Sequence, residues 1–458
     1  MINCTQPWFE MQIEYNERVG CCCYYKHERD HLELPVSVEK YWNSEILQDI
    51  RTIIASNNTK DTGCEGCQLL KHTPLTDFTK VPDCLNQAQK TNWERALYNY
   101  DRRVTVVDSY PVKYYLNFGL LCNLRCIMCS QENSRKDDCR LLPVEPLLAL
   151  KRYFTVADEI MVIGGEPFVL PNARRFIDAI ISDPDYADIK LSIVTNGTLL
   201  HNYLDQLKSI RRVNIWVSLD SIDSAYEHIR QGARWGDTER NILAFREIGA
   251  KHNLDWTINI GSVVMKSSIA KLDEFVDWCI DNDLPVHFVP IQPYEGVTSQ
   301  EDIFCDPGLL NDLPAWEDIF DCAIERLTQK NWIAAAARPL SLMKNEIKSR
   351  SLIIQGEDIF NRGNIRDALA LFLEAAEKDP SSAPAFNNTG VAYYKMGEFT
   401  KALRYFARAL RIDMNNRETV INCIKLLTVL GKSEDATNLY VSYLKNNPAD
   451  EAILNAFA

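Results

Sequence analysis

The chain has 458 residues, of which 46% are hydrophobic and 25% charged, proportions that are ordinary for a globular protein of two or three domains. Its net charge of −13 argues against a nucleic-acid partner, because phosphate binding depends on clustered Lys and Arg. No apolar run is long enough for a membrane span, and the first residues do not resemble a secretory signal, so we expect a cytoplasmic protein with reduced thiols.

Residues 1–110 are irregular and rich in cysteine. Their thiols gather at ligand spacing, in the consecutive Cys21, Cys22 and Cys23 and in the Cys-x2-Cys pair Cys64 and Cys67. Cysteines grouped in this way indicate a metal site rather than scattered core positions, and the pair suits zinc or an iron–sulfur cluster. Ser44, just before a helical pattern, is expected to cap the helix.

Between residues 111 and 345, short β-rich runs alternate with amphipathic helical patterns. The runs cover 114–119, 159–164, 189–195, 213–219, 256–264 and 286–291. This alternation predicts parallel βαβ units and therefore an α/β fold, an open or partly closed barrel. In such sheets the ligand chemistry lies in the loops at the carboxyl ends of the strands.

Three cysteines follow the first of these strands in the segment CNLRCIMC. They are Cys122, Cys126 and Cys129, spaced Cys-x3-Cys-x2-Cys. Four thiolates normally hold a [4Fe–4S] cluster, so three leave one iron open to another ligand. The alternative is a structural zinc site, which needs a fourth ligand such as Cys139.

A helical repeat begins near residue 352. Four kinds of position recur 34 residues apart: Gly363, Gly397 and Gly431; Ala368, Ala402 and Ala436; Phe372, Phe406 and Tyr440; and the unit ends Pro380, Met414 and Pro448. A period of this length with these residue types is the tetratricopeptide pattern. Stacked repeats of this kind form a concave surface that binds peptides or proteins.

The cysteine triplet, with the GGEP segment after the second strand, resembles the radical S-adenosylmethionine (SAM) superfamily over roughly residues 111–300. The resemblance implies a partial (β/α)6 barrel whose triplet holds the SAM-cleaving [4Fe–4S] cluster. It also implies SAM-binding residues at the strand ends, namely Gly164, Gly165, Glu166, Asn196, Ser218, Asp220 and Arg230. Many relatives carry an aromatic residue directly before the third cysteine, where this chain has Met128. Alternatively, Asp220 caps a helix and Arg230 forms a surface ion pair.

The first region resembles the auxiliary-cluster domain called SPASM, or its shortened form, twitch. The matching pieces are CTQPWFEMQI, the consecutive cysteines, YWNSEILQDIR and GCEGC. This resemblance implies a second [4Fe–4S] cluster held by Cys4, Cys22, Cys64 and Cys67. Cys22 is preferred to Cys21 and Cys23 by alignment alone. Cys84 would be a ligand instead if the alignment is shifted. The alternative is a zinc ribbon on the same four thiolates.

Together the resemblances imply a three-part enzyme, with a cysteine-rich domain at 1–110, the barrel at 111–345 and the repeats at 346–458. An electron donor such as flavodoxin or ferredoxin would drive cleavage of SAM to a 5′-deoxyadenosyl radical, which takes hydrogen from a substrate. Similar enzymes often modify peptides, so the expected substrate is a peptide or protein held by the repeats. The alternatives are a carbohydrate or other small-metabolite substrate, with the repeats recruiting a partner, and a non-catalytic metal-bound scaffold.

Overall fold

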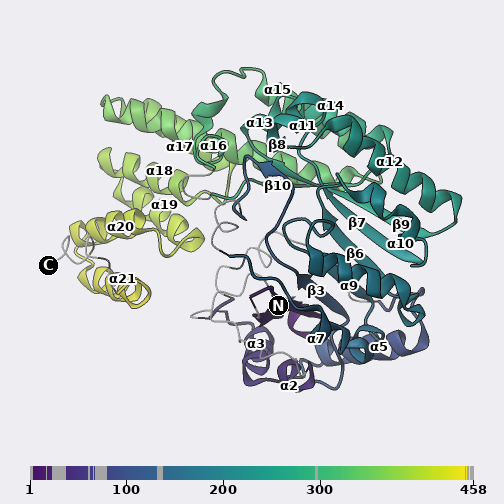
Figure 1. The fold of residues 1–458 in the computed structure, drawn as a ribbon. Coiled ribbons are helices and arrows are strands. Elements are labelled where there is room, and N and C mark those ends of the chain that lie inside the picture. The colour runs from purple at the N-terminus through teal and green to yellow at the C-terminus, as the bar shows by residue number, and fades with distance from the viewer. Residues whose placement is uncertain are drawn as a thin grey trace. The chain divides into compact units, whose positions relative to one another are not determined.

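The computed structural model describes residues 4–16, 18–22, 38–59, 62–64, 67, 80–131, 138–293, 298–448, 450 and 453. Cys23 lies outside the described residues. The chain forms two compact units, one of Met1–Ser262 with Trp278–His287 and one of Val263–Asp277 with Phe288–Ala458. Figure 1 shows the chain coloured from its N-terminus to its C-terminus.

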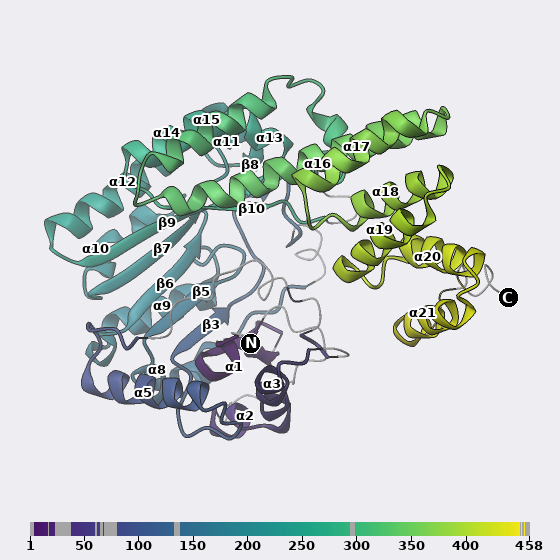
Figure 2. The ribbon, with the colours of Figure 1, turned by 180° about the vertical axis from the view of Figure 1, so that it is seen from behind.

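A largely parallel sheet is the framework of the first unit (Figure 2). Its strands follow the order β10-β9-β7-β6-β5-β3-β1-β2. Their bounds are β1 (Glu10–Ile13), β2 (Val19–Gly20), β3 (Lys113–Asn117), β5 (Glu159–Ile163), β6 (Lys190–Thr195), β7 (Arg212–Ser218), β9 (Asp255–Val264) and β10 (Val286–Pro290). Neighbours from β1 to β9 pair in parallel, and β2 pairs antiparallel with β1. The six strands expected between residues 111 and 345 are therefore confirmed.

The two faces of the sheet differ because side chains alternate along each strand. In β3, Tyr114 and Leu116 are fully buried on the outer face, whereas Lys113 and Tyr115 lie half-buried on the inner face. The Tyr114 ring meets the Phe154 ring edge-on at 4.8 Å, so the outer face packs against helices. The inner face carries the polar residues of the barrel.

The helices of this unit either precede the barrel strands or connect them. They are α1 (Gln6–Phe9), α2 (Val38–Trp42), α3 (Glu45–Ser56), α5 (Gln87–Asp101), α7 (Val144–Leu148), α8 (Lys151–Phe154), α9 (Pro171–Ser182), α10 (Leu204–Leu207), α11 (Asp223–Ile229) and α12 (Trp235–Lys251). The expected cap is confirmed, because the Ser44 side chain accepts a hydrogen bond from the Leu47 N–H at the start of α3.

The cysteine-rich segment contributes to the same sheet, which the sequence patterns did not reveal. Strand β1 pairs in parallel with β3 over four residue pairs, from Glu10 with Lys113 to Ile13 with Leu116. Beyond these strands, Asn117 donates a hydrogen bond from Nδ2 to Glu14 Oε2 at 2.7 Å. Residues before the barrel and the first barrel strand therefore share one hydrogen-bonded framework.

The second unit is mainly helical. It includes α13 (Lys266–Ile269), most of α14 (Leu272–Asp281), α15 (Trp316–Thr328), α16 (Ala337–Asn361), α17 (Ile365–Lys378), α18 (Ala383–Lys395), α19 (Phe399–Ile412), α20 (Arg417–Val429) and α21 (Ser433–Asn446). From the end of α16 onward the helices pair as the period of 34 predicted. Gly363, Gly397 and Gly431 each follow the first helix of a pair with a positive φ of 86°, 79° and 72°.

Small residues allow the paired helices to pack closely. A Cβ atom added at Gly390 in α18 would lie 2.6 Å from the Phe406 ring of α19, and one at Gly356 would lie 2.5 Å from Phe372. The same contact between a glycine and a phenylalanine ring therefore occurs in two successive repeats. Among the described residues, no helix is both long and apolar enough to cross a bilayer.

Candidate functional site

The cysteine triplet lies on the loop after β3, at the carboxyl edge of the sheet. Cys126 belongs to the short strand β4 (Arg125–Cys126), which pairs antiparallel with β8 (Arg230–Gln231) and so places Cys126 opposite Arg230. The Ile127 N–H donates to the Ile229 carbonyl at 3.0 Å, and the Cys129 N–H donates to the Cys126 carbonyl at 3.0 Å. Backbone hydrogen bonds thus fix the loop against the end of α11.

The GGE segment after β5 holds the other side of this loop. The N–H groups of Gly165 and Glu166 donate to the carbonyls of Gly119 and Leu121, both at 2.8 Å. A Cβ atom at Gly165 would lie 2.3 Å from the carbonyl oxygens of Leu120 and Leu121, too close for any side chain. In the structure, the glycine at position 165 is therefore required by the approach of the cysteine loop itself.

The Glu166 carboxylate connects two strand ends. It is fully buried and accepts hydrogen bonds from Thr195 Oγ1 at 2.8 Å, the Asn196 N–H at 2.7 Å and the Phe168 N–H at 3.1 Å. Burial raises the pKa of Glu166, and these three donors oppose that shift. The side chain therefore positions the loops after β5 and β6, while the backbone of the segment faces the cysteine loop.

Nitrogen donors lie close to the Cys122 and Cys126 sulfurs. Asn196 Nδ2 lies 3.7 Å and the Leu124 N–H 3.5 Å from Cys122 Sγ, and Arg230 Nη1 lies 3.8 Å from Cys126 Sγ. Burial raises the pKa of the Cys126 thiol to about 11, whereas the adjacent Arg230 charge lowers it. Thiolate ligands of a metal cluster are stabilised by such N–H donors and cations, so the residues present fit a cluster at this loop.

Arg230 is also paired with a second residue expected at the site. Its Nη2 lies 2.8 Å from Asp220 Oδ2, and both side chains are buried. Asp220 therefore does not cap α11, whose N-cap residue is Ile222, and Arg230 does not form a surface ion pair. Ser218, the last residue of β7, is half-buried at the same edge and pairs with Gly261 of β9.

The N-terminal cysteines are brought near one another. Cys4 precedes α1, Cys21 and Cys22 follow β2, and the Cys67 N–H donates to the Cys64 carbonyl at 3.3 Å. Burial raises the pKa of Cys4 to about 12, and repulsion from Cys64 and Cys67 adds to that rise. Cys21 is buried, and its pKa is raised by burial and by the nearby Cys4 and Cys64. The structure thus relates Cys21 to the expected residues Cys4, Cys64 and Cys67.

Within the described part of the chain, no three His, Cys, Asp or Glu side chains converge closely enough to hold a single metal ion. A single zinc ion draws all of its sulfur ligands to about 2.3 Å, whereas each iron of a cube takes its own thiolate. Cys122 and Cys126 therefore fit a cluster because N–H donors lie near their sulfurs and because their loop lies at the carboxyl edge of the sheet.

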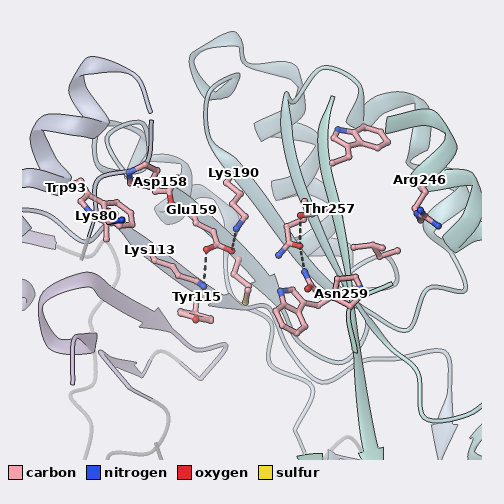
Figure 3. Close-up of a pocket in the computed structure, with 18 of the residues that line it drawn as sticks. Lys80, Trp93, Lys113, Tyr115, Asp158, Glu159, Lys190, Arg246, Thr257 and Asn259 are labelled. Atoms are coloured by element: carbon pink, nitrogen blue, oxygen red, sulfur yellow. Dashed lines mark hydrogen bonds and ion pairs between the residues drawn. The ribbon is translucent and has the colours of Figure 1, made fainter. Parts of the chain in front are cut away.

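A cavity that the sequence did not predict opens at the amino ends of the strands. Its volume is about 790 Å³, and inner-face side chains of several strands line it, including Lys113, Tyr115, Glu159, Lys190, Asn214 and Trp216. Figure 3 shows Glu159 between Lys113 and Lys190, at 3.0 Å and 3.9 Å. Polar residues at every second strand position were the signal for it. The cavity lies at the strand ends opposite to the cysteine loop.

Comparisons with known proteins agree with this architecture. Residues 116–279 match the model of the radical SAM superfamily, and residues 355–417 match a tetratricopeptide-repeat model. The GTP 3′,8-cyclase of Petrotoga mobilis is 32% identical over 180 residues, which cover 38% of this chain and 53% of that protein. The GTP 3′,8-cyclase of Peptoclostridium acidaminophilum is 26% identical over 234 residues, covering 48% and 69%.

Solved structures give a more distant likeness. Streptococcus suis SuiB, in a crystal structure bound to the precursor peptide SuiA, is 17% identical with a TM-score of 0.35, covering 67% of this chain and 68% of that one. The chain spans about half the length of the Petrotoga mobilis relative that it matches.

Proposed function

We propose that this chain, which carries a radical SAM domain followed by tetratricopeptide repeats, is an enzyme that cleaves SAM reductively and modifies a peptide or protein. The observation that carries the proposal is the donor-lined cysteine loop held by the GGE segment at the carboxyl edge of the sheet. We also propose a cytoplasmic location and an electron donor such as flavodoxin or ferredoxin.

Cys122, Cys126 and Cys129 would hold the [4Fe–4S] cluster, and Gly164, Gly165, Asn196, Ser218 and Arg230 lie on the segments that would bind SAM. Cluster and SAM together supply one-electron cleavage of a carbon–sulfur bond and removal of a hydrogen atom from the substrate. The chain's own residues orient them: Glu166 fixes two loops, Arg230 and Asn196 donate toward the thiolates, and Asp220 holds Arg230. We propose an auxiliary cluster at the N-terminal cysteines as well.

The test is anaerobic reconstitution with iron and sulfide, followed by addition of SAM and dithionite and detection of 5′-deoxyadenosine by mass spectrometry. Wild-type protein should release deoxyadenosine, and Cys126→Ala should release none. Cys322→Ala, a thiol of α15 in the other unit, serves as the matched control and should behave as wild type. Zinc bound in place of iron, or deoxyadenosine from Cys126→Ala, would contradict the proposal.

A chain of amide groups on the repeats favours a peptide ligand. Asn388 Nδ2 donates to Glu357 Oε1 at 2.8 Å, Asn387 Nδ2 to Asn388 Oδ1 at 3.1 Å, and Asn422 Nδ2 to Asn387 Oδ1 at 3.1 Å. These residues lie on α16, α18 and α20. Glu357 and Asn388 line a hollow of about 280 Å³ together with Phe360 and Val391, and Asn387 and Asn422 continue the chain of amides from there. Side-chain amides both donate and accept, as a peptide main chain requires.

The peptide hypothesis can be tested by panning a random peptide display library against the wild-type protein. Selected peptides should bind Asn388→Ala/Asn422→Ala at least about tenfold more weakly, because about 1.4 kcal/mol is lost with the amide partners. Thr437→Ala on the exposed side of α21 is the control and should bind them unchanged. Equal binding by all three proteins would contradict peptide docking in this hollow.

The relatives favour a second candidate, a small-metabolite substrate, because the matched curated proteins are GTP 3′,8-cyclases. Incubation of reconstituted protein with SAM, dithionite and GTP discriminates the two. Consumption of GTP would favour the metabolite candidate, and its persistence alongside peptide binding would favour the first.

A further inference from the structure

Arg51 of α3 is a cation in the interior of the cysteine-rich segment. Its side chain is fully buried. Nε donates to the Pro7 carbonyl at 2.9 Å and Nη1 to the Thr105 carbonyl at 2.8 Å, while the guanidinium lies 5.0 Å from the centre of the Trp42 ring. Nη2 is buried and has no hydrogen-bond partner among the described residues.

No carboxylate within the described residues forms an ion pair with Arg51. An unpaired buried charge costs several kcal/mol, so folded proteins pair such groups almost without exception. Two carbonyl dipoles, the Asn43 side-chain oxygen at 3.5 Å from Nη1 and one ring face do not supply a unit of negative charge. The interior around Arg51 is therefore built for an anion.

The thiols of the auxiliary site are the acidic groups around this position. Arg51 bonds to Pro7 in the helix that directly follows Cys4, and the Gln6 N–H donates to the Cys4 sulfur. Cys21 directly follows β2, whose Gly20 pairs with Gln12 of β1, the strand that continues from the same helix. The Cys21 thiol interacts electrostatically with Arg51, Cys4 and Cys64.

Further unpaired polar atoms lie beside Cys4. Thr5 Oγ1 and Gln6 Oε1 are buried and, among the described residues, find no hydrogen-bond partner. Like Arg51 Nη2, the Thr5 hydroxyl is a donor without an acceptor, which is costly in the interior. The sulfides and thiolates of a cluster are acceptors that would satisfy both donors.

We propose that Arg51 is the buried counter-ion of an auxiliary iron–sulfur cluster and that Cys21 supplies the fourth thiolate beside Cys4, Cys64 and Cys67. The proposal rests on the auxiliary cluster proposed above and replaces Cys22 in its ligand set. Cys22 is half-buried, whereas Cys21 is 2% exposed and lies near Cys4, Cys64 and Arg51. A cluster with four thiolates is an anion, and it would supply the negative charge that no carboxylate among the described residues gives Arg51.

The ligand assignment is tested by counting iron in a background that lacks the first cluster. In full-length Cys122→Ala/Cys126→Ala/Cys129→Ala protein, reconstitution should leave about four irons per chain, the content of one cube. Adding Cys21→Ser should remove most of this iron, and adding Cys22→Ser should leave it in place. Circular dichroism of each protein before reconstitution confirms that the variants fold alike.

Each outcome has a separate meaning. Loss of iron in Cys22→Ser, or retention in Cys21→Ser, would overturn the assignment of Cys21 while leaving the auxiliary cluster intact. Absence of iron from the triple-alanine background itself would overturn the auxiliary cluster, and this inference with it. Neither result bears on SAM cleavage, which is measured in protein with an intact triplet.

The counter-ion role is tested by the reduction potential of the auxiliary cluster, followed by electron paramagnetic resonance in the same background. A nearby positive charge favours the more negative, reduced cluster, so Arg51→Gln should shift the potential to a more negative value. Arg51→Lys keeps the charge and should remain near the starting value. A purely structural Arg51 would lower the melting temperature in both variants without moving the potential, and that result would overturn the role.

Discussion

Arg230 and Asp220 form a buried ion pair at 2.8 Å directly behind Cys126. Asp220 lies in the loop after β7 and Arg230 begins β8. The pair therefore joins the end of the sheet to the strand that supports the cysteine loop. A charge placed so deeply is stable only while its partner is present.

Removing one partner should therefore cost far more than removing an exposed pair. We expect Asp220→Ala to lower the free energy of unfolding by about 3–5 kcal/mol, because Arg230 would remain buried without its partner. Asp237→Ala, which breaks an exposed pair with Arg240, should cost about 0–1 kcal/mol. Urea unfolding of the apo-proteins measures both values, and equal losses would contradict the role of burial.

Gly165→Ala should displace the cysteine loop. The added methyl group would lie 2.3 Å from two loop carbonyl oxygens, so we expect reconstituted Gly165→Ala to bind less iron and to release less deoxyadenosine than wild type. Gly236→Ala in α12 is the matched control, since nothing lies within 4 Å of its added atom. Wild-type iron content and turnover in Gly165→Ala would show that the loop moves to accommodate the methyl group without loss of function, and would contradict the prediction.

The acid stability of the barrel should depend on Glu159. Burial opposes ionisation of this carboxyl, but Lys113 and Lys190 prevail and lower its pKa below the ordinary value of 4.5. A lowered folded-state pKa adds stability above the unfolded value, and this stability is lost as the pH falls through the folded one. Urea unfolding should show wild type losing more stability below about pH 4.5 than Glu159→Gln. The exposed Glu94→Gln should follow wild type, and parallel curves for all three proteins would refute the role of Glu159.

Gly390→Ala should destabilise the repeat region. Its Cβ atom would lie 2.6 Å from the Phe406 ring, which is itself buried between helices, so the helix pair must separate. Overpacking of this kind costs about 1–3 kcal/mol. Thermal unfolding followed by circular dichroism checks the effect against Thr437→Ala on exposed α21. An unchanged transition in Gly390→Ala would indicate that Phe406 can rotate away.

The sequence predicted those parts of the fold and the site that depend on residues close together in the chain. Apolar runs predicted the six strands, and the interval between Cys122, Cys126 and Cys129 predicted the loop, because both are properties of neighbouring residues. Contacts between distant residues were not accessible. The pairing of Arg230 with Asp220 and the contact of Gly165 with Leu121 depend on how loops from separate strands meet. Strand β1 was missed because EMQI is short and lacks a clear alternation.

The pairing of β1 with β3 also determines where the protein can be divided. The sequence predicts a domain boundary near residue 110, but cleavage there would strip β3 of its neighbour and expose its row of backbone N–H and C=O groups. An uncovered inner strand of this kind recruits other chains and promotes aggregation. Efforts to produce the barrel alone should therefore retain β1, either in place or supplied as a separate peptide.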